Sequence, residues 1–365
     1  MILTLVGDIS LSEIDVNAYK IDDMIIEYLL QSDFTIGNLE SPITNCEKKR
    51  DFLPLNLKSA QDSISLLKHF SYLNLCNNHI FDFGDKGYLD TIKFLEDNRI
   101  YYSGVIKRKT QQNDLPFKIN INSQEKVCII SATRWGNLKN TEYGTIAFKQ
   151  IERFIKRIIK EDYFLIYYPH WGYEYITIPP PDVRKHAHKM IDLGVDLIVG
   201  THPHIVQGYE MYKNKYIFYS LGNFIFNTKF NQTAYNQHLV NKSLVLKLSI
   251  KNKIVEKFHF QPFEFSEKGM LVNSDVINEK YLIEISKIFN ESNFVYKIEY
   301  YKQTVHLAKQ SAKIRNKLMN QSKKDKKFKS LLYNYLNATP QDIKNRIFAL
   351  LINKCSAILH RSKEK

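Results

Sequence analysis

The chain has 365 residues, of which 44% are hydrophobic, and its 52 Lys/Arg exceed its 38 Asp/Glu by a formal net charge of +14. This length and apolar content suit one large domain with an appendage, or two domains. No stretch approaches 18 consecutive apolar residues, so no transmembrane helix is expected. The four cysteines, Cys46, Cys76, Cys128 and Cys355, form no CxxC pair, which indicates ordinary thiols in a reducing compartment.

The N-terminal sequence MILTLVGDIS has neither a basic segment nor a small-residue cleavage site. We therefore expect no secretory signal. Together with the cysteine usage, this predicts a cytoplasmic protein, with peripheral attachment at the inner face of the membrane as an extension of that prediction.

Short apolar runs that fit buried strands alternate with helical patterns through the first 265 residues. The expected strands are residues 2–6, 34–36, 73–76, 127–130, 164–168, 197–199 and 217–219. The expected helices are residues 16–30, 59–69, 88–98, 151–159 and 182–193. This alternation predicts an α/β fold with a buried sheet. Residues 242–250 and 254–263 predict a late hairpin.

The composition changes beyond about residue 270. Residues 271–365 hold 19 Lys/Arg and 8 Asp/Glu, a net charge of +11, whereas residues 1–270 hold 33 and 30, a net charge of +3. Glycine is absent beyond residue 275, and the apolar spacing predicts two to four helices, one starting at Pro340 with Thr339 as its N-cap. The chain is therefore expected to divide into an α/β domain over residues 1–265 and a basic, mostly helical region over residues 271–365.

Polar residues follow six of the expected strands at the point where each strand ends. They are Asp8; Asn38 and Glu40; Asn78 and His79; His170 and Glu174; His202 and His204; and Asn223. Because the carboxyl ends of parallel strands share one edge of a sheet, these side chains are expected to converge on one cavity. Carboxylate, amide and imidazole ligands together suit Mn, Fe or Zn, and one or two such ions would favour attack on a phosphoryl group.

Each motif also has an ordinary structural interpretation. A role for Asp8 in a helix cap or turn is about as well supported as a role in a functional site. The same holds for Glu40, which would also fit a surface turn. His202 and His204 carry the strongest signal, because Pro203 fixes φ between the two imidazoles. His186 and His188 lie two residues apart on an expected helix and so face different directions. We interpret this last pair as surface histidines.

The order and wording of these motifs resemble the CapA-type poly-γ-glutamate capsule synthesis family, which is similar to the calcineurin-like metallophosphoesterases. The matching motifs are Gly7-Asp8; Asn38-Leu39-Glu40; Asn77-Asn78-His79 with Asp82-Phe83-Gly84; His170-Trp171-Gly172-Tyr173-Glu174-Tyr175; Gly200-Thr201-His202-Pro203-His204; and Tyr219-Ser220-Leu221-Gly222-Asn223-Phe224. The resemblance covers about residues 1–265 and implies a four-layer αββα fold.

The resemblance also implies roles for the site residues. Asp8 and His204 would hold a first metal ion, while Asn78, His170 and His202 would hold a second. Glu40 would take the place of the bridging carboxylate, and His79 would be the general acid. Asn38, Glu174 and Asn223 would line the substrate pocket. Ser10 stands where the phosphoesterases usually carry a histidine, which makes a weaker first metal site or a single metal ion plausible.

These observations favour a metal-dependent hydrolase or transferase that acts in bacterial capsule or surface-polymer synthesis on a small-molecule or polymer substrate. The alternative is a non-catalytic assembly factor whose basic helices bind capsule-synthesis proteins or an anionic membrane surface. A nucleic-acid phosphodiesterase is a third hypothesis. The charge of the C-terminal region allows it, but no interleaving of arginine and aromatic residues supports a nucleic-acid partner.

Overall fold

The computed structural model describes residues 1–17, 19–50, 56–108, 116–122, 124–134, 142–227, 237–266, 269–272 and 277–321. The chain divides into two compact units, one of Met1–Arg50 and Asn56–Asn290, and one of Asp51–Leu55 and Glu291–Lys365. The domain boundary that composition places near residue 270 stays a prediction. The expected helix at Pro340 lies outside the described residues.

Within the described part of the first unit, eight strands form one sheet. They are β1 (Ile2–Ile9), β2 (Phe34–Leu39), β3 (Tyr72–Asn74), β4 (Tyr101–Ser103), β13 (Asn223–Ile225), β14 (Lys242–Lys251), β15 (Ile254–Ser266) and β16 (Gly269–Val272). Their order is β16-β15-β14-β1-β2-β3-β4, and β13 also pairs with β1. Strands β1 to β4 and β13 run parallel, whereas β14 to β16 form antiparallel pairs.

A second sheet, counted over the same described ranges, has six strands in the order β11-β12-β10-β9-β7-β6. They are β6 (Phe117–Asn120), β7 (Lys126–Ile130), β9 (Phe164–Tyr167), β10 (Leu197–Val199), β11 (Val206–Tyr212) and β12 (Lys215–Leu221). Strands β7, β9, β10 and β12 are parallel. A small antiparallel pair joins β5 (Val105–Lys107) to β8 (Tyr143–Thr145).

The two sheets pack face to face through one apolar cluster. Leu5 of β1 and Leu246 of β14 lie in this cluster together with Ile129 of β7, Ile166 of β9 and Val199 of β10, all fully buried. Because both sheets bury this face, their parallel strands read as continuous apolar runs in the sequence.

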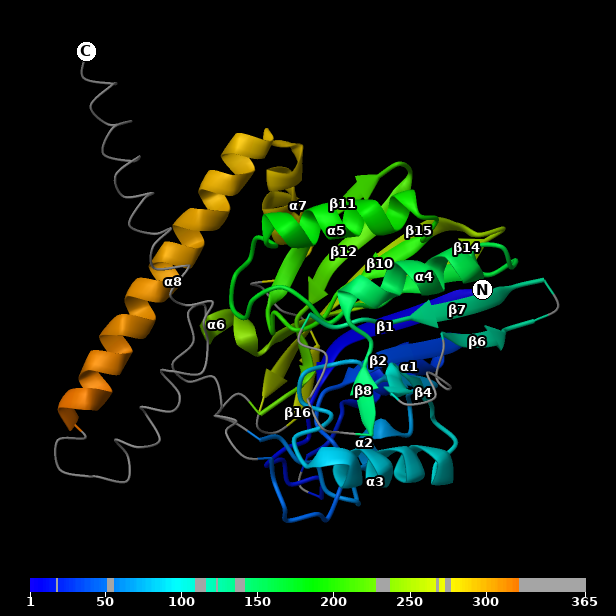
Figure 1. The fold of residues 1–365 in the computed structure, drawn as a ribbon, viewed down its shortest axis with the longest axis horizontal. Helices are drawn as coiled ribbons and strands as arrows, with labels where there is room; N and C mark the ends of the chain where they lie inside the picture. The colour runs from blue at the N-terminus through cyan, green and yellow to red at the C-terminus, as the bar shows by residue number, and fades with distance from the viewer. Residues whose placement is uncertain are drawn as a thin grey trace. The chain divides into compact units, whose positions relative to one another are not determined.

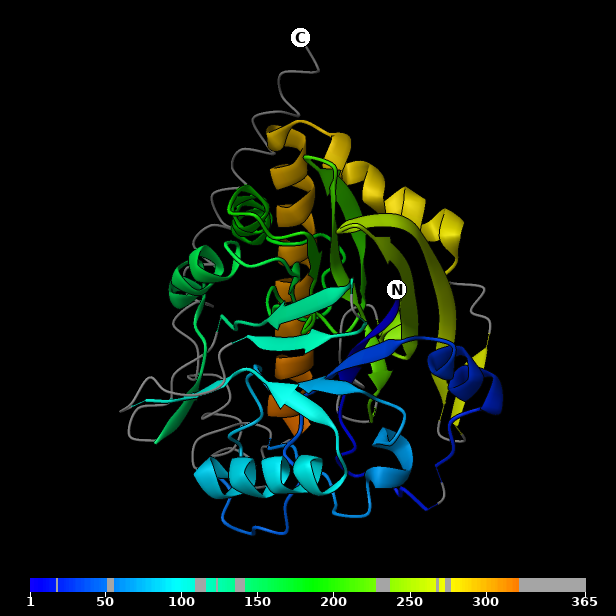
Figure 2. The ribbon, with the colours of Figure 1, turned by 90° about the vertical axis from the view of Figure 1, so that its right-hand side faces the viewer.

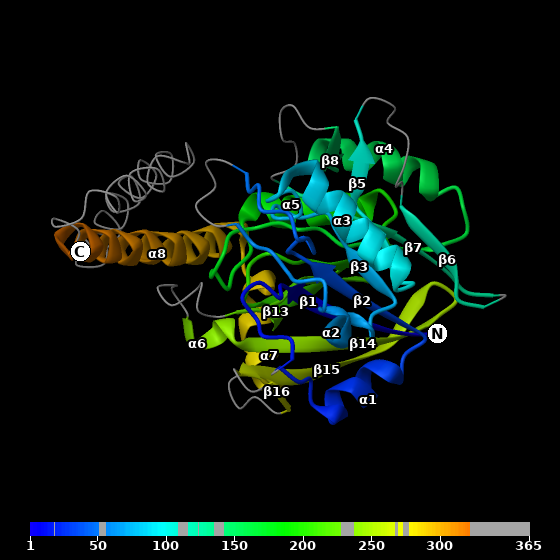
Figure 3. The same ribbon diagram turned by 90° about the horizontal axis from the view of Figure 1, so that it is seen from below.

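Helices cover the outer faces of the sheets. They are α1 (Asp23–Leu30), α2 (Ile64–Leu67), α3 (Gly84–Asp97), α4 (Phe148–Ile158) and α5 (Pro181–Asp192), with short α6 (Gln237–Val240) and α7 (Glu279–Ser286) elsewhere in the first unit. Apolar residues of α1, α2 and α3 share a cluster with the outer face of the first sheet. In Figure 1, α4 and α5 lie in front of the second sheet and α3 lies below the sheets; in Figure 2, after a quarter turn, α4 and α5 are at the left of the strands. Figure 3 shows α1 beside β15 and β16.

The second unit contains α8 (Asn293–Gln321), a helix of 29 residues. It satisfies in part the expectation of helices beyond residue 275. In the portion of the chain that the structure describes, no helix is both long and apolar enough to span a membrane.

The seven expected strands coincide with β1, β2, β3, β7, β9, β10 and β12, and the expected hairpin coincides with β14 and β15. One inference from the residues was wrong: the six polar strand ends do not share the edge of a single sheet. The ends of β1, β2 and β3 belong to the first sheet, and those of β9, β10 and β12 belong to the second. Asn223, which follows β12, is the first residue of β13. Two expected helices are shorter than predicted. Asp22 caps α1 by accepting a hydrogen bond from the Met24 amide, and α2 spans only four residues.

The two sheets meet where β1 passes the corner between β12 and β13. The Asp8 amide donates to the Gly222 carbonyl oxygen over 3.0 Å, and Asp8 pairs in register with Asn223. A Cβ on Gly7 would stand 1.8 Å from that same oxygen. Only glycine therefore fits at position 7, and this close approach brings Asp8 next to strands of the second sheet.

Gly7→Ala is expected to destabilise the protein by about 1–3 kcal/mol or more, because the added methyl group meets backbone and cannot be accommodated by a rotamer change. Gly84→Ala is the matched control. A Cβ there meets no atom within 4 Å, so only its φ of +63° opposes the substitution, at about 1 kcal/mol. Chemical denaturation of both variants checks this. Equal losses for the two would show that the close approach at Gly7 does not constrain the fold.

Candidate metal centre

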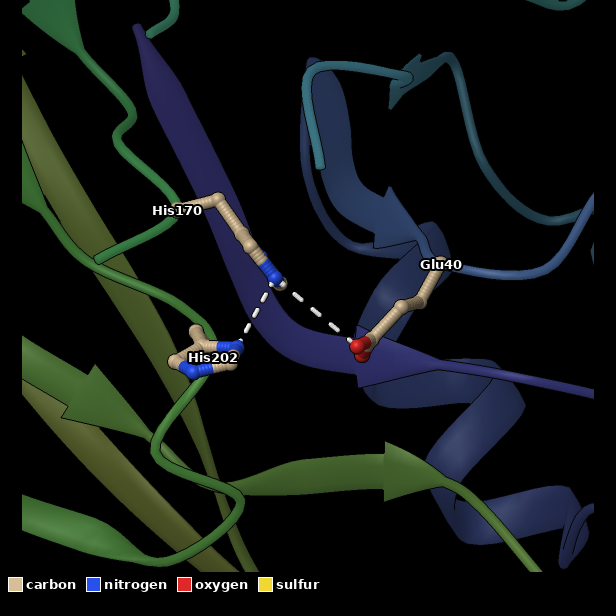
Figure 4. Close-up of side chains that lie close together, drawn as sticks. All are labelled: Glu40, His170 and His202. Carbon is tan, nitrogen blue, oxygen red and sulfur yellow. Dashed lines mark hydrogen bonds and ion pairs between the residues drawn. The ribbon is translucent and has the colours of Figure 1, made fainter. Parts of the chain in front are cut away.

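Both sheets contribute side chains to one buried cluster. Asp8 lies in β1, and Glu40 directly follows β2. His170 follows β9, and His202 and His204 follow β10. All five are buried. Figure 4 shows Glu40, His170 and His202 pointing toward one another, Glu40 from the first sheet and the two histidines from loops after strands of the second.

Ligand atoms of these residues form overlapping groups. The atoms of Glu40, His170 and His202 lie within 4.8 Å of one another, as do those of Asp8, Glu40 and His204. Glu40 belongs to both groups. Its Oε1 lies 3.8 Å from His170 Nε2 and 3.8 Å from His204 Nε2. A third group joins Glu174 to His202 and His204. The carboxylate of Glu40 therefore lies between two sets of candidate ligands.

The Glu40 carboxylate is fully buried, and neither of its oxygens has a hydrogen-bond partner among the residues that the structure describes. A buried carboxylate without donors costs several kcal/mol unless a proton or a cation compensates it. The residues around Glu40 therefore fit a metal ion, which would supply the missing partner to the orphaned oxygens.

Second partners orient the candidate ligands. Asn38 donates to Asp8 Oδ1 over 2.8 Å. Asn223 Oδ1 lies 2.9 Å from His204 Nδ1, so Nδ1 carries the proton and Nε2 is left free to face Glu40. Partners of this kind fix the tautomer and ring orientation of a ligand. Asn38 and Asn223 are fully buried, and their predicted role in binding substrate stays a prediction.

Asn78 and Thr201 contact His170. Asn78 Oδ1 lies 2.7 Å from His170 Nε2, and Thr201 Oγ1 lies 3.1 Å from Nδ1. His202 Nδ1 lies 3.1 Å from His170 Nε2. Asn78 and His202 thus both contact His170, while Asp8 and His204 form another group with Glu40.

The loop that carries His202 and His204 has an uncommon backbone. His202 has a φ of 98° and His204 a φ of 58°, a region that residues other than glycine rarely adopt. The His202 amide donates to Asp8 Oδ2 over 3.0 Å, which ties the loop to β1. A strained backbone of this kind persists where the surrounding contacts hold it in place, and it is common at functional sites.

His79 lies at the edge of the cluster. Its Nδ1 is 2.7 Å from Asp82 Oδ2, and its Nε2 is 3.9 Å from Glu40 Oε1. Asp82 is buried and also accepts from the Leu57 amide over 2.8 Å. Because Asp82 accepts the Nδ1 proton, Nε2 is the nitrogen that faces the site.

Burial shifts the pKa values of the central groups. It raises the pKa of Glu40 well above its usual value, and the nearby carboxyls of Asp8 and Glu174 raise it further. Burial also raises the pKa of Asp8. The pKa values of His170 and His202 are lowered well below the usual value, first by burial and then by neighbouring imidazoles. Both histidines are therefore neutral, which is the form that binds metal ions.

His186 and His188 lie outside the cluster, but they are not simple surface residues as predicted. His186 stacks on Phe148 with ring centroids 4.3 Å apart. His188 Nε2 lies 2.8 Å from Glu210 Oε1. Asp82 stands in one of the matching motifs, but no role was predicted for it. Its position three residues after His79 is the sequence signal that could have indicated the contact between the two side chains.

The fold and the donor set together define a mixed α/β protein with a carboxylate–histidine site that could hold a metal ion. A family model described as "Bacterial capsule synthesis protein PGA_cap" matches residues 3–228. The chain belongs to this family of CapA-type capsule synthesis proteins.

Two relatives carry the family name. "Capsule biosynthesis protein CapA" of Bacillus anthracis is 31% identical over 253 residues, which is 63% of this chain and 61% of that protein. "PGA biosynthesis protein CapA" of Bacillus subtilis (strain 168) is 30% identical over 315 residues, covering 80% of this chain and 79% of that protein. A solved structure of a hypothetical protein from Thermus thermophilus aligns over 73% of this chain with a TM-score of 0.48 and 11% identity, which is too distant to support a conclusion.

Glu40→Gln is expected to stabilise the metal-free protein at pH 8 relative to the wild type. A carboxyl whose pKa is raised by folding contributes stability at low pH, and that contribution is lost as pH rises above about 4.5. The gain should therefore shrink as pH falls toward 5. Manganese should raise the melting temperature of the wild type but not of the variant, because the variant lacks the central ligand.

Thermal unfolding between pH 5 and 8, with and without manganese, measures this effect. Glu152→Gln is the control, since Glu152 is a partly exposed carboxylate paired with Lys189. If Glu40→Gln melted like the wild type at every pH and still responded to manganese, Glu40 would not be the centre of the cluster.

Proposed function

We propose that this protein is a metal-dependent hydrolase or transferase of the metallophosphoesterase type that acts in the synthesis of a bacterial capsule or surface polymer. The observation that carries this proposal concerns the buried Glu40 carboxylate. It has no hydrogen-bond partner among the described residues, and it belongs to two groups of candidate ligands. The names of the two Bacillus relatives, both described as capsule or PGA biosynthesis proteins, support the biological setting.

The arrangement of the fold supports the metallophosphoesterase type. Two sheets share an apolar interface, and helices cover the outer face of the first sheet. We interpret this arrangement as a four-layer αββα sandwich. In such a fold the site would lie where the carboxyl ends of both parallel sets of strands meet, which is where the cluster is found.

Asp8 and His204 would hold one metal ion, and Asn78, His170 and His202 would hold another, with Glu40 shared between them. Mn, Fe or Zn suit this mixture of oxygen and nitrogen donors. A bound divalent ion supplies Lewis-acid polarisation of a substrate oxygen and lowers the pKa of a water molecule. The Ser10 hydroxyl accepts from the Ser12 amide over 3.4 Å, and a neutral hydroxyl in place of a histidine would make the first metal site weaker.

His79 would act as the general acid. Asp82 accepts the Nδ1 proton of His79 and orients the ring, so that Nε2 would be the nitrogen that delivers a proton to the leaving group. The imidazole is partly exposed, at 15% for its side chain, whereas the ligands are buried. This difference suits a residue that exchanges protons with solvent between turnovers.

The competing proposal is a non-catalytic assembly factor that keeps the fold. Metal analysis of the purified protein separates the two, since only the enzyme requires bound metal. A screen of phosphomonoesters, phosphodiesters and γ-glutamyl amides with each metal in turn would then identify the reaction.

His79→Ala is expected to keep its metal and lose activity by about 10²–10⁴-fold, the usual contribution of a general acid. His202→Ala is expected to lose both metal and activity. Metal content measured by elemental analysis, together with turnover on the best substrate of the screen, checks both expectations. His79 would have to be reassigned as a ligand if its removal emptied the site.

We also propose that the basic C-terminal region binds an anionic surface, in the first place phospholipid headgroups. The part of it that the structure describes, α8, carries six Lys/Arg and one Glu. The five lysines within residues 323–329 lie outside the described residues. A solvated helical face that aids solubility is the competing interpretation.

Each Lys or Arg near an anionic membrane contributes about 1 kcal/mol. Replacing the five lysines of residues 323–329 by glutamine should therefore reduce co-sedimentation with anionic vesicles, and neutral vesicles should bind neither form. The Debye length is about 8 Å at physiological salt and becomes shorter as salt is added. Binding should therefore weaken sharply above physiological salt. Identical sedimentation of the two proteins, or binding indifferent to salt, would leave this region with a structural role.

A further inference from the structure

Arg134 lies beside the cluster, at a position that neither the motifs nor the ligand groups include. Its amide donates to the His170 carbonyl oxygen over 3.3 Å, and the preceding Thr133 forms a bridge with His170. The guanidinium carbon lies 5.2 Å from the centre of the Tyr173 ring. The backbone of a candidate ligand and a ring three residues beyond it thus hold Arg134 in place.

The guanidinium is only partly paired. Nη2 contacts Asp182 Oδ2 over 3.0 Å, but Nη1 is buried and has no hydrogen-bond partner among the described residues. The Asp182 side chain is itself 63% exposed, and the Arg134 side chain is 28% exposed. A surface pair of this kind is weak, so it does not account for an arginine whose second nitrogen is buried and has no hydrogen-bond partner among the described residues.

Arg134 also lies beside the third group of candidate ligands. Its guanidinium is over the ring of Tyr173, the residue that precedes Glu174 of that group. A cation next to neutral histidines and candidate metal ligands makes this side of the site attractive to anions. The planar guanidinium also matches the geometry of carboxylate and phosphate oxygens, which explains why arginine is the residue used most for their recognition.

We infer that Arg134 is a substrate-binding residue that receives an oxyanion, a carboxylate or a phosphate, through its Nη1 side next to the reacting group. The inference rests on the proposed function and adds the class of substrate: a molecule with a negative charge beside the bond that is cleaved or transferred. The metal ligands engage the reacting group, and Arg134 engages its charged neighbour.

Binding of two simple anions tests this role without requiring turnover. Inorganic phosphate and glutarate are titrated by calorimetry into the full chain, with and without manganese. Arg134→Gln should weaken at least one of them about ten-fold or more, the range of one hydrogen bond between charged partners, while the manganese content is unchanged. The anion that is affected identifies phosphate or carboxylate as the group bound.

Three further variants separate binding from structure. Arg134→Lys should retain part of the affinity, because the charge remains. Arg153→Gln, at an exposed arginine on α4, should bind both anions like the wild type. Asp182→Asn should bind them at least as tightly, because it removes the competing carboxylate and keeps the guanidinium.

The inference is overturned if the wild type binds neither anion, or if Arg134→Gln and Arg134→Lys both bind them within two-fold of the wild type. It is also overturned if Asp182→Asn loses as much affinity as Arg134→Gln, since that would show that the pair of Arg134 and Asp182 has a structural role. These outcomes can be told apart from a failure of the proposed function. If the protein bound anions through Arg134 but turned over no substrate, the proposed enzymatic activity would be refuted and the anion-binding role of Arg134 would stand.

Discussion

A carboxylate that is buried without a hydrogen-bond partner is the constraint on which the rest of this site depends. Removing Glu40 from water costs several kcal/mol, and no donor of the described chain repays that cost. The surrounding histidines do not repay it either, because burial keeps His170 and His202 neutral. A bound cation would resolve this arrangement, because ligand atoms of Asp8, Glu40 and the histidines already lie close together.

The polar groups around the cluster follow from the same constraint. Asp8 and His204 are each held by the side chain of a second residue. Asn38 holds Asp8, and Asn223 holds His204. Amide side chains suit this task, because they form hydrogen bonds without adding a charge to a region that already contains several buried carboxyls. The cluster is therefore organised before any ion binds, which lowers the cost of binding.

The sequence predicted the strands well, because they produce local signals. It also placed the candidate ligands at strand ends, and their role in binding metal stays a prediction. Buried parallel strands leave apolar runs, and Asp8, His170 and His202 each follow such a run within a few residues. It could not predict how the strands divide between two sheets, since that depends on pairings such as β1 with β13, more than 200 residues apart. The orienting roles of Asn38 and Asn223 were missed for a related reason: an amide beside a ligand looks the same in sequence as an amide that lines a pocket.

The close approach of Gly7 to Gly222 has a consequence for folding. Asp8 and His202 are 194 residues apart, and they meet only after the two sheets have docked. Neither sheet alone holds a complete set of ligands, so the site requires the whole domain and not just one of its sheets. An ion bound between Asp8, Glu40 and the histidines would act as a cross-link between the sheets. Metal affinity and resistance to separation of the sheets would then be two measures of one equilibrium.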